Sequence, residues 1–211
     1  MYLAIKQYTE IELIINKSRF IAQINRAETE EEALEFIKQI KKKHYNATHN
    51  CSCYIIGPDK MIQKQNDDGE PSGTAGIPMI EVLRKNNLTD TVVVVTRYFG
   101  GIKLGASGLI RAYSQAVSEA IKASGIIEKK LMRLIDVHFD YSLIGLLEHK
   151  LSSYEVINRT YLEKVCFTYR IDEDKVQAFL AYLIDLTNNN IKYELKDFTL
   201  CEVDYLGTLS A

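Results

Sequence analysis

Residues 91–111 read TVVVVTRYFGGIKLGASGLIR and hold the clearest structural signal in the chain. The β-branched run at 91–97 predicts a strand that is buried on both faces. The glycines that follow predict a tight turn. Residues 106–124 then repeat apolar side chains at helical spacing, with Gly125 as the residue that ends the helix. The stretch therefore predicts a strand, a glycine-rich loop and a long helix in direct succession.

A second glycine-rich loop, residues 67–76, comes before this strand and reads DDGEPSGTAG. The two loops together place small residues, backbone N–H groups and several charges where a strand ends and a helix begins. The N-terminus of a helix attracts anions, because its first N–H groups have no partner within the helix and the helix dipole is positive there. The sequence thus indicates an anion-binding region as well as a fold.

The composition is that of a globular protein. A chain of 211 residues with 46% hydrophobic content is long enough for two domains. No segment is apolar over the length of a bilayer, and the start of the chain lacks a signal-peptide pattern. Four cysteines at irregular spacing do not indicate a disulfide framework, so we expect a cytoplasmic protein with no membrane partner.

Charge is distributed unevenly along the chain. Residues 1–130 hold 18 Lys and Arg against 15 Asp and Glu, a balance of +3. Residues 131–211 hold 8 against 13, a balance of −5. A polyanionic partner would therefore meet the first half.

The two halves predict different arrangements of helices and strands. The first half predicts strands at 8–15, 18–25 and 52–56, a helix behind the capping-box pair Thr29 and Glu32, and a short helix from Pro78 to about Asn86. The second half predicts strands at 135–141, 154–162, 164–171 and 192–203, with helices at 142–151 and 176–184. This βαββαβ order is the ferredoxin-like arrangement. We expect an α+β fold with domains at 1–128 and 129–211.

The loop between Gly100 and Gly105 has the glycine spacing of a nucleotide-binding P-loop but not its lysine. Ala106 and Ser107 stand where that motif needs Lys and Ser or Thr, and the only lysine, Lys103, lies inside the loop. A phosphate or an RNA backbone could still dock at the helix start. The candidate anion-binding residues are Arg97, Tyr98, Gly100, Gly101, Lys103, Gly105 and Arg111, with Ser72 and Thr74 from the other loop.

The same residues also fit a purely structural interpretation. The glycines would then serve a tight turn that needs positive φ angles. For Arg97 we favour an ion pair with a residue of the acidic loop.

Metal binding is the less favoured interpretation of two residue clusters. Asp67, Asp68 and Glu70 could bind Mg²⁺ if they converge, but acidic loops are usually solvated and the EF-hand pattern is absent. A second cluster consists of His44, His49, Cys51 and Cys53, where the one-residue gap between the cysteines does not suit structural zinc. His138 and His149 are expected to be surface or hydrogen-bonded histidines. We therefore expect no cofactor, with Mg²⁺ as the alternative.

Several of these motifs resemble the YigZ/IMPACT family. The resemblance rests on residues 67–78, 96–105 and 111–113, with supporting matches at 18–21 and 47–51. It implies a first domain similar to domain 2 of ribosomal protein S5, and a ferredoxin-like second domain similar to the last domain of elongation factor G. Eukaryotic members of the family resemble translation regulators that act through a kinase-activating partner, whereas the resemblance assigns no catalytic residue.

The leading hypothesis is a protein that binds RNA or the ribosome, with a role in translation or stress regulation. One alternative is an enzyme that acts on a phosphorylated small molecule or nucleotide with Mg²⁺, although no catalytic set is evident and we favour a non-enzyme. The other is a protein-interaction module whose partner is a translation-associated protein in a kinase pathway.

Overall fold

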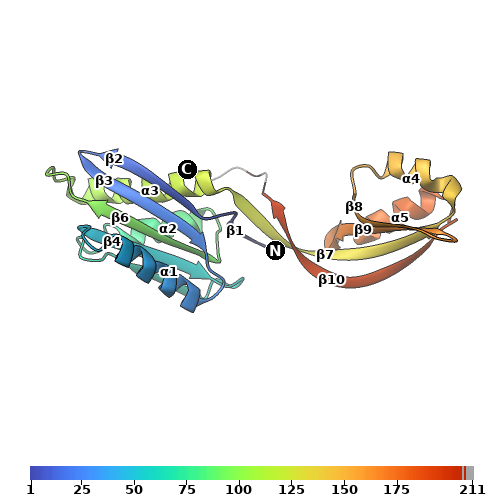
Figure 1. The fold of residues 1–211 in the computed structure, drawn as a ribbon, viewed down its shortest axis with the longest axis horizontal. Helices are drawn as coiled ribbons and strands as arrows, with labels where there is room; N and C mark the ends of the chain where they lie inside the picture. The colour runs from blue at the N-terminus through green and yellow to red at the C-terminus, as the bar shows by residue number, and fades with distance from the viewer. Residues whose placement is uncertain (206, 208–211) are drawn as a thin grey trace. The chain divides into compact units, whose positions relative to one another are not determined.

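The computed structural model describes residues 1–205 and 207 (Figure 1). The chain forms two compact units, residues 1–129 with the described residues from Val203 on, and residues 130–202. Each unit combines helices with antiparallel strands. The α+β class and the two-domain organisation are thus confirmed.

The first unit is built on a five-stranded sheet in the order β2-β3-β6-β4-β5. Its strands are β2 (Thr9–Ile15), β3 (Ser18–Arg26), β4 (His49–Ile56), β5 (Ile62–Asn66) and β6 (Thr91–Tyr98). Asn16 and Lys17 adopt positive φ angles in the predicted hairpin turn between β2 and β3. β5 was not predicted, because its residues are mostly polar and exposed, as expected of an edge strand.

Helices cover both faces of this sheet (Figure 1). Val93 and Val95 of β6 pack in one core with α2 (Gly76–Lys85) and α3 (Gly105–Ser124). Val92 packs in a second core with α1 (Glu30–Lys43). Because side chains alternate along a strand, α1 lies on the face opposite to α2 and α3. The prediction that β6 is buried on both faces is confirmed.

Two helix ends also follow the sequence prediction. The Thr29 hydroxyl accepts a hydrogen bond from the Glu32 amide at 3.2 Å and caps α1. Gly125, at a φ of 71°, ends α3 with its amide bonded to the Ile121 carbonyl. These local signals set the directions in which the chain enters and leaves its helices.

The second unit has the predicted βαββαβ order. Its elements are β7 (Ile126–Phe139), α4 (Ile144–Lys150), β8 (Glu155–Tyr161), β9 (Val165–Asp172), α5 (Val176–Leu186) and β10 (Lys192–Asp204), with short 3₁₀ turns at Tyr141–Leu143 and Glu173–Lys175. The start of β7 and the end of β10 belong to the first unit. Alternate side chains of β7 and β9, including Val137 and Phe167, form its core with α4 and α5. None of the described helices combines the length and apolar character that crossing a bilayer requires.

β7 begins nine residues earlier than the predicted strand, at Ile126 instead of Ile135. Its first residues pair with β1 (Tyr2–Ile5) in the first unit, and residues 132–139 pair with β9 in the second. The part of β7 before Ile135 was not predicted, because Lys129 interrupts its apolar pattern. That lysine is buried and lies 2.5 Å from a Glu28 carboxylate oxygen and 3.7 Å from one of Asp90.

Gly100 lies where the chain leaves β6 and passes the β2–β3 hairpin. A Cβ added there would lie 2.0 Å from the carbonyl carbon and oxygen of Lys17. Gly101 differs, because it has a φ of 84° and open space around the position of a Cβ. Glycine is therefore required at position 100 because the backbone of Lys17 passes close to it, and at position 101 because its φ angle is positive.

This difference predicts unequal costs for two neighbouring substitutions. Gly100→Ala should lower the free energy of unfolding by about 3 kcal/mol, because the hairpin backbone must move. Gly101→Ala should lower it by about 1 kcal/mol, the strain of a left-handed alanine. Urea unfolding followed by circular dichroism measures both. Equal losses for the two variants would contradict this account of the turn.

Candidate anion-binding site

Arg97 is the buried cation at the end of β6. It is 5% exposed, and its Nη1 donates to Glu70 Oε1 at 2.7 Å. Its guanidinium carbon lies 5.4 Å from the centroid of the Phe20 ring and 5.5 Å from that of Phe99. The ion pair expected between Arg97 and the acidic loop is present. Arginine is suited to this place because its guanidinium can stack on aromatic rings and donate in its own plane.

Glu70 accepts hydrogen bonds from two other parts of the first unit, Arg97 of β6 and Tyr113 of α3. The Tyr113 hydroxyl of α3 donates to Glu70 Oε1 at 2.8 Å, and His49 Nε2 of β4 lies 3.8 Å from Oε2. The Cys51 thiol lies 3.3 Å from the same tyrosine oxygen. Burial raises the pKa of the Cys51 thiol to about 12, and burial also raises the pKa of Tyr113. Both groups therefore keep their protons and serve as hydrogen-bond donors near neutral pH.

The other two acidic residues of the loop bind different donors. Asp67 accepts from the amides of Gly73, Ala75 and Gly76 at 2.8 to 3.0 Å, so it shapes the turn that leads into α2. Asp68 accepts from the Lys41 ammonium and from the Asn50 amide, both at 2.6 Å.

The proposed Mg²⁺ site at Asp67, Asp68 and Glu70 has no support in this geometry. The carboxylates do not form a converging cluster in the part of the chain that the structure describes. Each is engaged by protein donors instead.

A cavity of about 380 Å³ lies at the start of α3 and is called here the α3 cavity. Its lining includes Glu70, Arg97, Phe99, Lys103 and Gly105. No side chain of the described residues caps α3, and its first turn carries no acidic residue. Arg97 Nε is buried and has no hydrogen-bond partner among the described residues. The charge of Arg97 is offset by Glu70, so the cavity combines a helix N-terminus, the unpartnered Nε donor of Arg97 and the exposed cation of Lys103, which together favour a bound anion.

The structure assembles only part of the predicted residue set. Lys103 and Gly105 line the α3 cavity with Arg97, while Gly100 and Gly101 form the turn beside it. Arg111 is exposed further along α3 and does not line the cavity.

Three predicted residues lie elsewhere. The Tyr98 hydroxyl contacts His44 Nδ1 at 3.0 Å and Asn46 Oδ1 at 3.2 Å. Tyr98 follows Arg97 in the strand and therefore points to the opposite face of the sheet, so grouping the two in one site was wrong. Thr74 is buried and donates to the Pro71 carbonyl at 2.7 Å, and Ser72 is exposed outside the cavity lining.

Lys17 was missed as a candidate residue. It is exposed in the β2–β3 turn, and its backbone lies against Gly100. The only signal in the sequence is the hairpin turn itself, which gives no indication of what the turn packs against.

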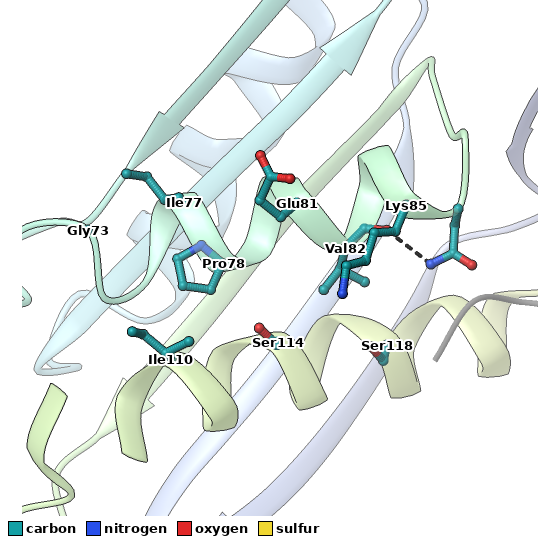
Figure 2. A pocket seen from close by; sticks show the side chains of 10 residues that line it. Gly73, Ile77, Pro78, Glu81, Val82, Lys85, Ile110, Ser114 and Ser118 are labelled. Atoms are coloured by element: carbon teal, nitrogen blue, oxygen red, sulfur yellow. Dashed lines mark hydrogen bonds between the residues drawn. The ribbon is translucent and has the colours of Figure 1, made fainter. Parts of the chain in front are cut away.

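A larger cavity of about 440 Å³ lies between α2 and α3 (Figure 2). Figure 2 shows Pro78 and Val82 on α2 facing Ile110 and Ser114 on α3. One acidic residue, Glu81, and one basic residue, Lys85, lie on its α2 side. The start of α2 borders this cavity, but the amides of Gly73, Ala75 and Gly76 there already donate to Asp67. The lining of the cavity also lacks a buried charged residue, so we place the candidate site in the smaller α3 cavity.

The hydrogen bonds of Asp67 predict a pH-dependent effect on stability. Burial raises the pKa of this carboxyl, but its bonds to the Gly73, Gly76 and Ala75 amides outweigh burial, so the pKa lies below its ordinary value. A carboxyl with a lowered pKa contributes stability above its unfolded pKa and loses it as the pH falls through the folded pKa. Asp67→Asn should cost about 1–3 kcal/mol at pH 7.

The cost of Asp67→Asn should shrink between about pH 5 and pH 2, as the native carboxyl takes up a proton. Urea unfolding at a series of pH values measures this change. Asp59→Asn is the matched control, because Asp59 is exposed and accepts a long amide hydrogen bond, from Met61 at 3.3 Å. A cost for Asp67→Asn that stays constant down to pH 2 would contradict the assigned hydrogen bonds.

The buried ion pair predicts strong coupling between Arg97 and Glu70. Arg97→Met should lower the free energy of unfolding by about 3–5 kcal/mol, because it leaves a buried carboxylate without its partner. Adding Glu70→Gln should restore a large part of the loss, because the unpaired charge is then gone. A double-mutant cycle at pH 7 measures the coupling, and additive losses would show that the pair does not interact as described.

Comparison with known proteins identifies the family. Residues 16–121 match the family model described as Impact N-terminal domain, and residues 137–190 match one described as a domain of unknown function, DUF1949. The IMPACT family member YvyE of Bacillus subtilis is 49% identical over 203 residues, which are 95% of this chain and 94% of the relative.

A second relative and a solved structure extend the match. The IMPACT family member YigZ of Escherichia coli is 32% identical over 84% of this chain and 89% of its own length. A solved structure described as a crystal structure of an hypothetical protein is 29% identical, with a TM-score of 0.59, and covers 91% of this chain and 95% of its own. These matches span both units, and the chain belongs to the IMPACT family.

Proposed function

We propose that the protein binds RNA, free or in the ribosome, by accepting a backbone phosphate in the α3 cavity. The observation that carries this proposal is the uncapped start of α3, which opens on a cavity lined by Arg97 and Lys103. Phosphate groups bind at such helix starts through backbone N–H groups and nearby cations. Glu70 also lines the cavity, but its charge is compensated by Arg97.

The surroundings of the cavity add support for an extended polyanion. Lys17, Lys103 and Arg111 are exposed and have no ion-pair partner among the described residues. Phe99 is 47% exposed and lines the cavity, so its ring is available for stacking on a base. Unpaired cations and an exposed aromatic ring are the usual elements of a surface that binds single-stranded RNA.

A role in translation or stress regulation is part of this proposal. Its basis is membership in the IMPACT family together with the translation-linked function that the family resemblance implies. The contacts in the α3 cavity support binding of an anion, and RNA is the polyanion that fits such a role.

The α3 cavity also supports a second candidate, a phosphorylated small molecule or nucleotide. Its volume of about 380 Å³ lies within the range of small-molecule sites. The buried Glu70 in its wall could contact a polar group of such a ligand. This candidate differs from the first because it needs the cavity but not Arg111, which lies outside it.

RNA affinity as a function of salt tests the proposal. Fluorescence anisotropy with a labelled single-stranded RNA should show binding that weakens as salt increases. Lys103→Ala and Arg111→Ala should each weaken RNA binding. Each should also reduce the slope of log affinity against log salt concentration by about 0.7, the value for loss of one phosphate contact on a single strand. Lys42→Ala is the control, because Lys42 is exposed on α1, on the opposite face of the sheet.

The outcomes separate the two candidates. Absence of RNA binding at low salt, or equal affinities for Lys103→Ala and Lys42→Ala, would overturn the RNA proposal. Stabilisation by mononucleotides that Lys103→Ala abolishes and Arg111→Ala leaves intact would favour the small-molecule candidate.

A further inference from the structure

The second unit has a polar cluster on the face of its sheet that does not contact the helices. Along β7, Asp136 and His138 alternate with core residues such as Val137, so both side chains lie on the outer face. Along β9, Cys166 and Thr168 lie on that face for the same reason. All four residues are half-buried.

The strand register brings these residues together. His138 pairs with Cys166, and Asp136 pairs with Thr168. Side chains directly opposite each other in an antiparallel pair have Cβ atoms about 4.5–5.5 Å apart. One donor atom each of Asp136, His138 and Cys166 lies within 4.8 Å of the other two, and His138 Nε2 is 3.9 Å from Cys166 Sγ.

These distances are near those of a metal site. Bond lengths at tetrahedral zinc place neighbouring ligand atoms about 3.4–3.6 Å apart. The His138–Cys166 distance is only a few tenths of an ångström longer. Small side-chain rotations would therefore bring three donors onto one ion without a change in the backbone.

The chemical types of the three donors, a carboxylate, an imidazole and a thiol, determine which metal the site would prefer. Calcium and magnesium prefer oxygen ligands, whereas a thiolate with an imidazole favours zinc among the common divalent ions. Three protein ligands leave the fourth tetrahedral position for water or a ligand. Thr168 Oγ1 donates to Asp136 Oδ1 at 2.6 Å, which orients the carboxylate as outer hydrogen bonds do at metal sites.

We propose that the outer face of the second unit binds one zinc ion through Asp136, His138 Nε2 and Cys166 Sγ, with water in the fourth position. Binding displaces the thiol proton of Cys166 to solvent and forms a zinc–thiolate bond. Lys196 Nζ lies 3.4 Å from Asp136 Oδ2 and 2.9 Å from Glu194 Oε2, so it can remain with Glu194 when the ion binds. The site is independent of the α3 cavity.

Cobalt substitution in the full-length chain tests this proposal. Metal-free protein titrated with Co²⁺ should bind one equivalent and show a thiolate-to-cobalt absorption band together with the visible bands of tetrahedral cobalt. Zn²⁺ should displace the cobalt and abolish both. Cys166→Ser should remove the thiolate band, and Cys201→Ser should leave it unchanged, because Cys201 lies outside the cluster.

Zinc affinity from competition with a chromophoric chelator gives the second readout. Asp136→Asn should weaken binding by about 100-fold, and Thr168→Ala by about 10-fold, because the first removes a ligand charge and the second only its orienting hydrogen bond. Absence of the thiolate band in the wild-type protein, or its persistence in Cys166→Ser, would overturn the proposal. Circular dichroism verifies that each variant is folded.

Discussion

The buried ion pair between Arg97 and Glu70 is the interaction on which the first unit depends. Two charges with 5% and 7% exposure are costly to remove from water unless each is paired and hydrogen-bonded. Arg97 meets the carboxylate at 2.7 Å, and the Tyr113 hydroxyl supplies a further donor at 2.8 Å. The acidic loop is thereby fixed to both β6 and α3. Because Glu70 is engaged in this way, it does not cap α3, whose amides remain available to a ligand.

Local signals in the sequence were sufficient for most of the fold. The capping pair at Thr29, the helix-ending Gly125 and the β-branched run of β6 all act over a few residues, and each lies where it was predicted. The start of β7 was not predictable in the same way. Its buried Lys129 is acceptable only because Glu28 and Asp90, far away in the sequence, surround it.

The candidate sites were harder to predict than the fold, because they depend on which strands are neighbours. The glycine-rich motif suggested a single site from Arg97 to Arg111, but strand alternation places Tyr98 on the opposite face. Lys17 joins the region only through the packing of the hairpin against Gly100. Likewise, His138 and Cys166 are separated by 27 residues of chain and meet only through the register of β7 with β9. His44, His49, Cys51 and Cys53, which are close in sequence, form no such cluster among the described residues.

Observation of the α3 amides during ligand binding is the most direct test of the central claim. In a ¹⁵N-labelled sample titrated with inorganic phosphate and then with single-stranded RNA, the amide resonances of Ala106, Ser107 and Gly108 should shift in both titrations. Those of α1, on the opposite face of the sheet, should stay in place. If RNA binds and shifts other amides while these three remain unmoved, the start of α3 is not the anion site and the account of the first unit is wrong.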